Sequence, residues 1–95
     1  MTDWIDGDTL AQDDIREACF PSELDNLPAN ATDEHIAKAM AEHLVGSILN
    51  YKTKRGARDM LLKRGKLLRC IARINPDLWD WIFIEYAEQA QILDR

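Results

Sequence analysis

Two rows of apolar residues between positions 32 and 53 limit this chain to a narrow range of folds. Within each row the residues recur at every fourth position, which places them on one face of a helix. Thr32 can cap such a helix, and Asp33 and Glu34 suit the positive end of its dipole. The pattern predicts a long central helix over residues 32–53, with apolar rows Ile36, Met40, Leu44, Ile48 and Ala37, Ala41, Val45, Leu49.

The next segment, residues 57–74, is both amphipathic and strongly basic. Its apolar residues fall on one side of a helical wheel, but Arg64 interrupts them. Gly65 follows, and a glycine inside a helix costs about 1 kcal/mol relative to alanine. We therefore expect either one helix over residues 57–74 or two short helices that meet at Gly65.

The last segment begins with Asn75 and Pro76, a typical cap and first residue of a helix. It predicts a helix over residues 76–93. One face is expected to enter the core, with Trp79, Ile82, Phe83, Tyr86, Ala90 and Leu93. Residues 79–86 are also rich in strand formers, so a strand is the alternative. The proline start and the polar, alanine-containing tail favour the helix.

The N-terminal segment, residues 1–31, is acidic. Residues from about Thr9 to Cys19 predict a short helix, capped by Asp8 or Thr9 and ended by Phe20-Pro21, because the residue before a proline avoids helical geometry. Residues 21–30 contain two prolines and two asparagines, which predicts an ordered connecting loop.

Together these segments predict an all-α fold, a small single-domain bundle of four helices, or five if Gly65 breaks the third. The chain has 95 residues, of which 46% are hydrophobic, enough for one modest core. The helices over 32–53 and 76–93 are expected to form that core, with the basic helix packed across them.

Charge is strongly segregated along the chain. Residues 52–73 hold nine of the twelve Lys and Arg residues and only one acid, so the blocks 1–50, 52–73 and 74–95 carry net charges of −9, +8 and −4. The basic block either binds a polyanion, binds an acidic protein surface, or is neutralised by its acidic flanks. The candidate polyanion-binding residues are Arg55, Arg58, Lys66, Arg69 and Arg73.

The acidic N-terminal segment suggests a second hypothesis. A row of carboxylates can imitate the phosphates of a nucleic acid and occupy the cationic groove of a protein that handles DNA or RNA. An ordinary solvated acidic face is the simpler interpretation. The row consists of Asp3, Asp6, Asp8, Asp13, Asp14 and Glu17.

The second face of the last helix is the candidate partner-binding surface. Four of the seven aromatic residues lie between positions 79 and 86, and aromatic side chains dominate both cores and interface hot spots. The alternative is that the N-terminal helix or the 21–30 loop covers this face. The candidate partner-binding residues are Trp81, Ile84, Glu85, Glu88 and Ile92.

Residues with catalytic or metal-binding chemistry are few. His35 and His43 lie two helical turns apart, about 12 Å, which is too far to share a metal. Cys19 and Cys70 have no zinc-type spacing and no catalytic motif around them. We therefore expect no metal, no cofactor and no enzymatic activity.

The sequence favours a non-enzymatic protein-binding module, an adaptor or small inhibitor that docks on another protein. A pI near 4.9 argues against a general nucleic-acid coat. The alternatives are nucleic-acid binding through residues 54–73 and a homo-oligomeric structural protein, with a homodimer through the last helix. Two isolated cysteines and the absence of an apolar leader favour the cytoplasm. Because no apolar stretch approaches the ~18 residues that span a bilayer, we expect no membrane partner. Size, acidity and helicity suit a phage or mobile-element accessory protein that acts on a nucleic-acid-handling host complex.

Overall fold

The computed structural model describes residues 14–93, and this part of the chain is all-α. Six helices and no strand occur within it, which confirms the predicted fold class. The strand alternative for residues 79–86 is wrong. The helices are α2 (Ile15–Ala18), α3 (Pro21–Leu24), α4 (Asp33–Asn50), α5 (Lys54–Lys63), α6 (Gly65–Ile74) and α7 (Pro76–Leu93).

Helix α4 is the central element that the sequence predicts. The Thr32 hydroxyl accepts a hydrogen bond from the His35 backbone N–H at 3.2 Å and caps its first turn. The helix ends at Asn50, because Tyr51 adopts an extended backbone. Both predicted apolar rows are buried except at Leu49, which is 53% exposed at the edge of the face.

The basic segment forms two helices, which confirms the second of the two predictions for it. The residue between them is Arg64, directly before Gly65. Arg64 ends α5 and precedes α6, with φ −104° and ψ 26°. Gly65 has no positive φ, so its conformational freedom does not create the break. Helix α5 also begins earlier than predicted, because the Thr53 hydroxyl caps it by accepting from the Gly56 N–H at 3.0 Å.

Helix α7 has the bounds that the sequence predicts. The Asn75 side chain accepts a hydrogen bond from the Asp77 N–H at 3.1 Å, and Pro76 occupies the first helical position. Ile82 is fully buried and Ala90 nearly so. This helix packs more extensively on α4 than on any other element, which agrees with the predicted core pair.

The predicted helix from Thr9 to Cys19 is not continuous. Asp14 has an extended backbone and caps α2 through its side chain, which accepts from the Arg16 N–H at 2.9 Å. Residues 9–13, including the predicted cap, lie outside the described residues. The helix ends before Pro21 as expected, but the predicted 21–30 loop opens with the short helix α3.

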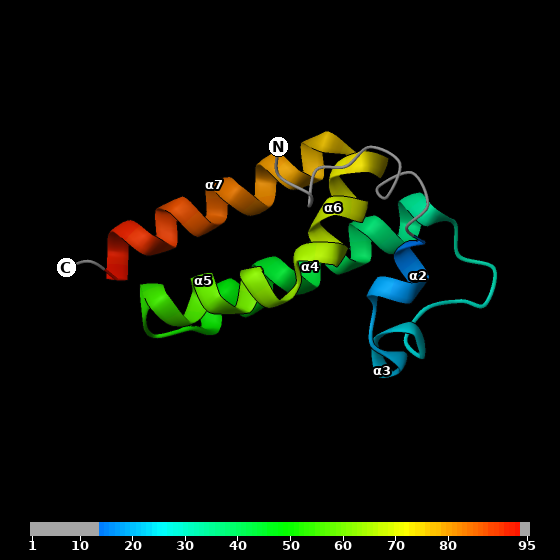
Figure 1. Ribbon diagram of the computed structural model, residues 1–95, viewed down its shortest axis with the longest axis horizontal. Coiled ribbons are helices and arrows are strands. Elements are labelled where there is room, and N and C mark those ends of the chain that lie inside the picture. Colours follow the sequence, from blue (N-terminus) through cyan, green and yellow to red (C-terminus); the bar gives the residue numbers. More distant parts are fainter. Residues whose placement is uncertain (1–13, 94–95) are drawn as a thin grey trace, which may run out of the picture.

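In Figure 1, α5 and α7 extend along the same side of the molecule, with α4 behind them, while α6 rises between α5 and the start of α7. Helices α2 and α3 lie at the other end. α2 contacts both α4 and α6 and buries Ile15 completely. The core therefore forms where α4, α6, α7 and α2 meet. None of the described helices is long and apolar enough to cross a membrane.

Candidate functional site

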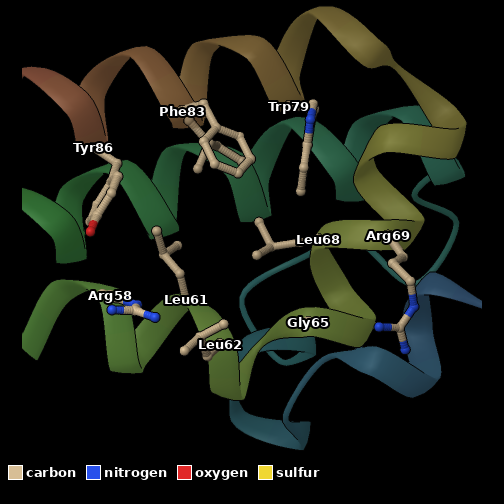
Figure 2. A pocket seen from close by; sticks show the side chains of 10 residues that line it. Arg58, Leu61, Leu62, Gly65, Leu68, Arg69, Trp79, Phe83 and Tyr86 are labelled. Carbon is tan, nitrogen blue, oxygen red and sulfur yellow. The ribbon is translucent and has the colours of Figure 1, made fainter. Parts of the chain in front are cut away.

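An apolar groove lies between α7 on one side and α5 with α6 on the other (Figure 2). Its volume is about 550 Å³, which falls in the ~300–1,000 Å³ range of ligand-binding pockets. Two arginines are the only charged residues among the described ones that line it. The lining consists of Arg58, Leu61, Leu62, Gly65, Leu68, Arg69, Trp79, Ile82, Phe83 and Tyr86.

The α7 wall of the groove is aromatic. Trp79, Phe83 and Tyr86 follow one another at spacings of four and three residues, so they share one side of the helix over about two turns. The Trp79 and Phe83 rings meet edge to face, with centroids 4.5 Å apart. Phe83 is 45% exposed. The prediction that Phe83 belongs to the core is therefore wrong, and its ring lies in the groove.

The opposite wall comes from leucines of α5 and α6. Leu61 and Leu68 are buried, whereas Leu62 is 67% exposed. Leu62 and Phe83 therefore present large apolar surfaces to solvent from the two sides of one groove. Single exposed apolar residues are common on protein surfaces, but a continuous apolar patch is typical of a binding site.

The two arginines lie at opposite ends of the groove. Figure 2 shows Arg58 at the Tyr86 end and Arg69 at the Trp79 end. Arg58 is exposed. Arg69 is partly buried, and its Nε atom is buried without a hydrogen-bond acceptor among the described residues. An oxygen acceptor at this end would satisfy that N–H.

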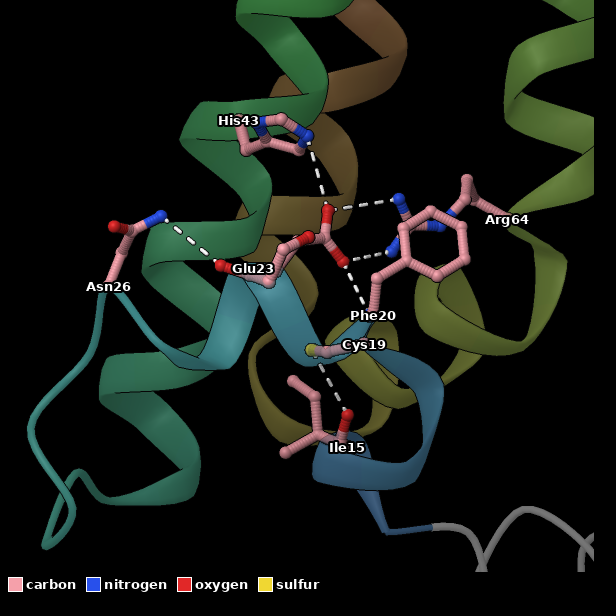
Figure 3. Close-up of polar contacts among 8 residues, drawn as sticks. Ile15, Cys19, Phe20, Glu23, Asn26, His43 and Arg64 are labelled. Atoms are coloured by element: carbon pink, nitrogen blue, oxygen red, sulfur yellow. Dashed lines mark hydrogen bonds and ion pairs between the residues drawn. The ribbon is translucent and has the colours of Figure 1, made fainter.

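A polar cluster outside the groove holds the junction between α5 and α6. The Arg64 guanidinium donates two hydrogen bonds to the Glu23 carboxylate, at 2.7 and 3.1 Å, and lies 4.2 Å from the centroid of the Phe20 ring. The other contacts of the carboxylate are His43 Nε2, at 3.2 Å, and the Phe20 N–H, at 2.8 Å (Figure 3). This cluster joins α3 to α4 and to the junction that shapes the groove.

Two pKa shifts follow from this cluster. Burial by itself raises the pKa of Glu23, but the hydrogen bonds from Arg64 and Phe20 and the positive charge of Arg64 outweigh it, so the pKa falls below its ordinary 4.5. Burial and the neighbouring Glu23 charge raise the pKa of the Cys19 thiol to about 11. The thiol donates to the Ile15 carbonyl at 3.3 Å. Cys19 is thus a protonated thiol at neutral pH, not a nucleophilic thiolate.

The structure divides the predicted basic stripe between two helices. Arg55 and Arg58 lie on α5, whereas Lys66, Arg69 and Arg73 lie on α6. A helical wheel drawn for one continuous helix, the first of the two predictions, lines up all five residues, but the break at Arg64 redirects α6 (Figure 1). Only Arg58 and Arg69 of this set line the groove.

The predicted partner-binding residues lie on the far side of α7 from the groove. Ile84 is 55% exposed and Ile92 60% exposed, and Glu88 is exposed as well. Trp81 is partly buried and packs against the core, and Glu85 is also partly buried. None of these five residues lines the groove. This face is therefore two exposed isoleucines beside a half-buried tryptophan, without the concave form of the groove.

The acidic row of the N-terminal segment falls largely outside the described residues. Asp3, Asp6, Asp8 and Asp13 lie there, and only Asp14 and Glu17 are described. Asp14 caps α2. Within residues 14–93 no group of three or more His, Cys, Asp or Glu side chains is arranged to hold a metal ion.

The groove could not be deduced from helical wheels alone. The wheel of the basic segment places Leu62 among the arginines, and this apolar residue in a charged row is the one sequence signal that could have indicated the groove. Phe83 carries no such signal, because its position on α7 belongs equally to a buried face. Its exposure depends on where α5 stops and α6 begins.

We compared the chain with protein-family models, with curated proteins and with solved structures, and none of the three comparisons returned a match. The groove's own geometry and chemistry therefore carry the functional interpretation.

Proposed function

We propose that this protein is a non-enzymatic binding module, an adaptor or small inhibitor, whose groove receives an apolar-faced helix of another protein. The observation that carries this proposal is the pairing of Leu62 and Phe83. They are 67% and 45% exposed and line one groove from opposite helices. Covering both would remove apolar surface from water, which is the main favourable term in protein association.

The shape of the groove favours a helix as the occupant. Helix-in-groove recognition places an apolar stripe with spacings of three and four residues into a trough between helices. The side chains of Trp79, Phe83 and Tyr86 supply such a trough with aromatic contacts, which are enriched at interface hot spots. Trp79 and Tyr86 already pack against the core, and the Phe83 ring packs against that of Trp79, so binding orders few new side chains.

The described chemistry supports a binding role over a catalytic one. Cys19 is protonated and bonded to a backbone carbonyl, and the Glu23 carboxylate is saturated by Arg64, His43 and Phe20. Both described cysteines are free and buried, which supports a cytoplasmic site of action, because reduced thiols persist there. The small size and acidity of the chain suit a phage or mobile-element accessory protein.

Peptide binding tests the proposal directly. We expect helical peptides of about 18 residues with a Leu/Phe stripe to shift the Trp79 indole N–H signal in ¹H–¹⁵N NMR spectra. Leu62→Ser and Phe83→Ala should weaken binding by about tenfold each. Leu49→Ser is the matched control, since Leu49 is 53% exposed but lies on α4 away from the groove. Equal binding by Leu62→Ser and Leu49→Ser would exclude the groove as the site.

The sequence-based partner surface is tested in the same titration. If Ile84→Ser and Ile92→Ser weaken peptide binding while Leu62→Ser does not, the outer face of α7 is the docking surface. Self-association through that face predicts a concentration-dependent mass in analytical ultracentrifugation that the same two variants abolish.

Nucleic-acid binding through the basic helices remains the competing hypothesis. It predicts a salt-sensitive shift of DNA or RNA oligonucleotides that Lys66→Glu with Arg69→Glu abolishes. The division of the basic residues between α5 and α6 weighs against it, since a phosphate backbone needs a continuous basic track.

A further inference from the structure

The two charges in the groove specify the chemistry of its occupant. We infer that the groove selects an acidic amphipathic helix, one whose apolar stripe is flanked by carboxylates about two turns apart, and that Arg69 anchors one of them. This inference rests on the proposed function and adds a partner class to it.

The first support is the sign of the charges. The described lining includes Arg58 and Arg69 but no aspartate or glutamate. Neither arginine has an ion pair among the described residues, whereas Arg16 and Arg64 are both paired, with Asp33 and Glu23. Within residues 14–93 the groove thus combines an apolar floor with two cations that have no ion pair, although the chain as a whole has a net charge of −5.

The second support is the state of Arg69. Its Nε–H is buried and has no acceptor within residues 14–93, and the side chain is only partly exposed. A carboxylate of an occupant would therefore reach Nε–H only after the Arg69 side chain turns toward the groove. Its Nη1 lies 3.5 Å from the point where a Cβ on Gly65 would stand, so the guanidinium rests against the α6 backbone with part of its donor set unused. A guanidinium presents Nε–H and Nη–H in parallel, which matches the two oxygens of a carboxylate.

The third support is spacing. Figure 2 shows Arg58 at the Tyr86 end of the groove and Arg69 at the opposite end, where its guanidinium is directed toward Gly65. Tyr86 and Trp79, which mark these two ends on α7, are seven positions apart. Seven residues span about 10.5 Å along a helix. An occupant helix that lies along α7 would therefore carry acidic residues near positions i and i+7, which share one side of the helix at the edge of its apolar stripe.

A single-stranded nucleic acid is the other occupant that aromatic rings and arginines can suit, because bases stack on aromatic side chains. The lining argues for a helix. Leu61, Leu62, Leu68 and Ile82 supply aliphatic walls between only two cations, and the sugar–phosphate chain gains nothing from aliphatic contact. The oligonucleotide is therefore included as an arm of the test.

The experiment compares three helical peptides that share one apolar stripe and carry Glu, Gln or Lys at the two flanking positions. Their dissociation constants are measured by fluorescence anisotropy at low and high salt with the full chain. We expect the Glu peptide to bind about tenfold more tightly than the Lys peptide. High salt should reduce this preference, because it screens exposed charge pairs.

Matched variants locate the preference. Arg69→Met and Arg58→Met should bring the three peptides close together in affinity, whereas Arg69→Lys should retain part of the preference. Arg55→Met is the control, since Arg55 is exposed on α5 and does not line the groove. Thermal melts followed by circular dichroism confirm that each variant is folded before binding is compared.

The outcomes separate this inference from the proposed function. If none of the peptides binds, the groove is not a helix-binding site and both fail. If all three bind equally, the groove binds helices without regard to charge and only this inference fails. If a single-stranded oligonucleotide binds more tightly than the Glu peptide and loses binding in Arg69→Met, the occupant is a polyanion.

Discussion

At the scale of single residues, the contact with the widest effect joins Glu23 to Arg64. These side chains are 9% and 11% exposed and are separated by 41 positions in the chain. The hydrogen bonding is bidentate, because Arg64 Nη1 and Nη2 each donate to one oxygen of the Glu23 carboxylate. The guanidinium also lies over the Phe20 ring. Removing one member of a largely buried pair leaves the other as a charge without its partner, which is more destabilising than replacing both.

We therefore expect Arg64→Met to lower the free energy of unfolding by about 3 kcal/mol, measured by urea denaturation. Glu23→Gln combined with Arg64→Met should recover part of that loss, because no buried charge is left unpaired. Arg55→Met is the exposed control and should change stability by less than about 0.5 kcal/mol. If Arg64→Met lowered the free energy of unfolding no more than Arg55→Met does, the Glu23–Arg64 pair would not stabilise the fold.

The same carboxylate makes stability depend on acid pH. The pKa of Glu23 is lower in the folded protein than its ordinary 4.5, so the unfolded chain binds more protons between the two values. Its contribution is present above pH 4.5 and is lost as the pH falls through the folded pKa. We expect Glu23→Gln to flatten the fall in stability below pH 4.5, measured by urea midpoints across that range.

Glu17→Gln serves as the control for the acid titration, because Glu17 is an exposed carboxylate on α2 with no recorded ion pair in the described residues. This variant should keep the acid dependence of the original chain. Identical curves for both variants would assign the acid sensitivity to other groups.

At the scale of elements, the decisive feature is that α5 and α6 are separate helices. Arg64 takes φ −104° and ψ 26° between them, and its N–H still bonds to the Leu61 carbonyl at 3.1 Å. The break lets Leu61 and Leu62 of α5 and Leu68 of α6 face the same groove. On a single straight helix Leu61 and Leu68 would still share a face, because they are seven positions apart, but α6 would continue along the axis of α5.

Two glycines in these helices differ in what an added methyl group would meet. At Gly65 a Cβ would stand 3.5 Å from Arg69 Nη1, an ordinary contact, whereas at Gly56 it would stand 2.9 Å from Tyr51 Cδ1. We expect Gly65→Ala to stabilise the protein by about 0.4–1 kcal/mol, because alanine lowers the entropy of the unfolded chain. Gly56→Ala should be the less stable variant in urea denaturation. The reverse order would show that the break needs a glycine.

At the scale of the whole molecule, apolar and charged surfaces are distributed unevenly. Helices α2, α4 and α6 and one side of α7 share a continuous buried core, while an apolar groove between α7 and the α5–α6 pair stays open among the described residues. Basic residues gather on α5 and α6, and the acids lie mainly on other segments. The groove is thus an apolar surface with positive ends on an acidic protein.

An open apolar groove with cationic ends predicts binding of anionic apolar dyes. We expect 8-anilinonaphthalene-1-sulfonate to become fluorescent with the native protein, since exposed apolar surface enhances its emission. Phe83→Ser should reduce the signal severalfold. Ile84→Ser, which changes a 55%-exposed residue outside the groove, should leave it unchanged. Equal loss in both variants would place the dye elsewhere on α7.

The elements that could be predicted from sequence are those whose signals are local. Thr32 caps α4 and Asn75 caps α7 because a side-chain oxygen reaches an N–H only two or three residues away. The four-residue spacing of Ile36 to Ile48 marks the buried face of α4 for the same reason. The basic character of the segment containing Arg58 and Arg69 was equally plain.

The break at Arg64 and the exposure of Phe83 were decided only by the tertiary structure. Local propensity allows α5 and α6 to continue as one helix, and it is Glu23, 41 positions away, that pairs with Arg64 at the turn. That turn sets where α5 stands relative to α7 and so whether Phe83 is covered. The helical period of a sequence indicates which residues share a face. Whether another element covers that face depends on long-range packing, which a local pattern cannot predict.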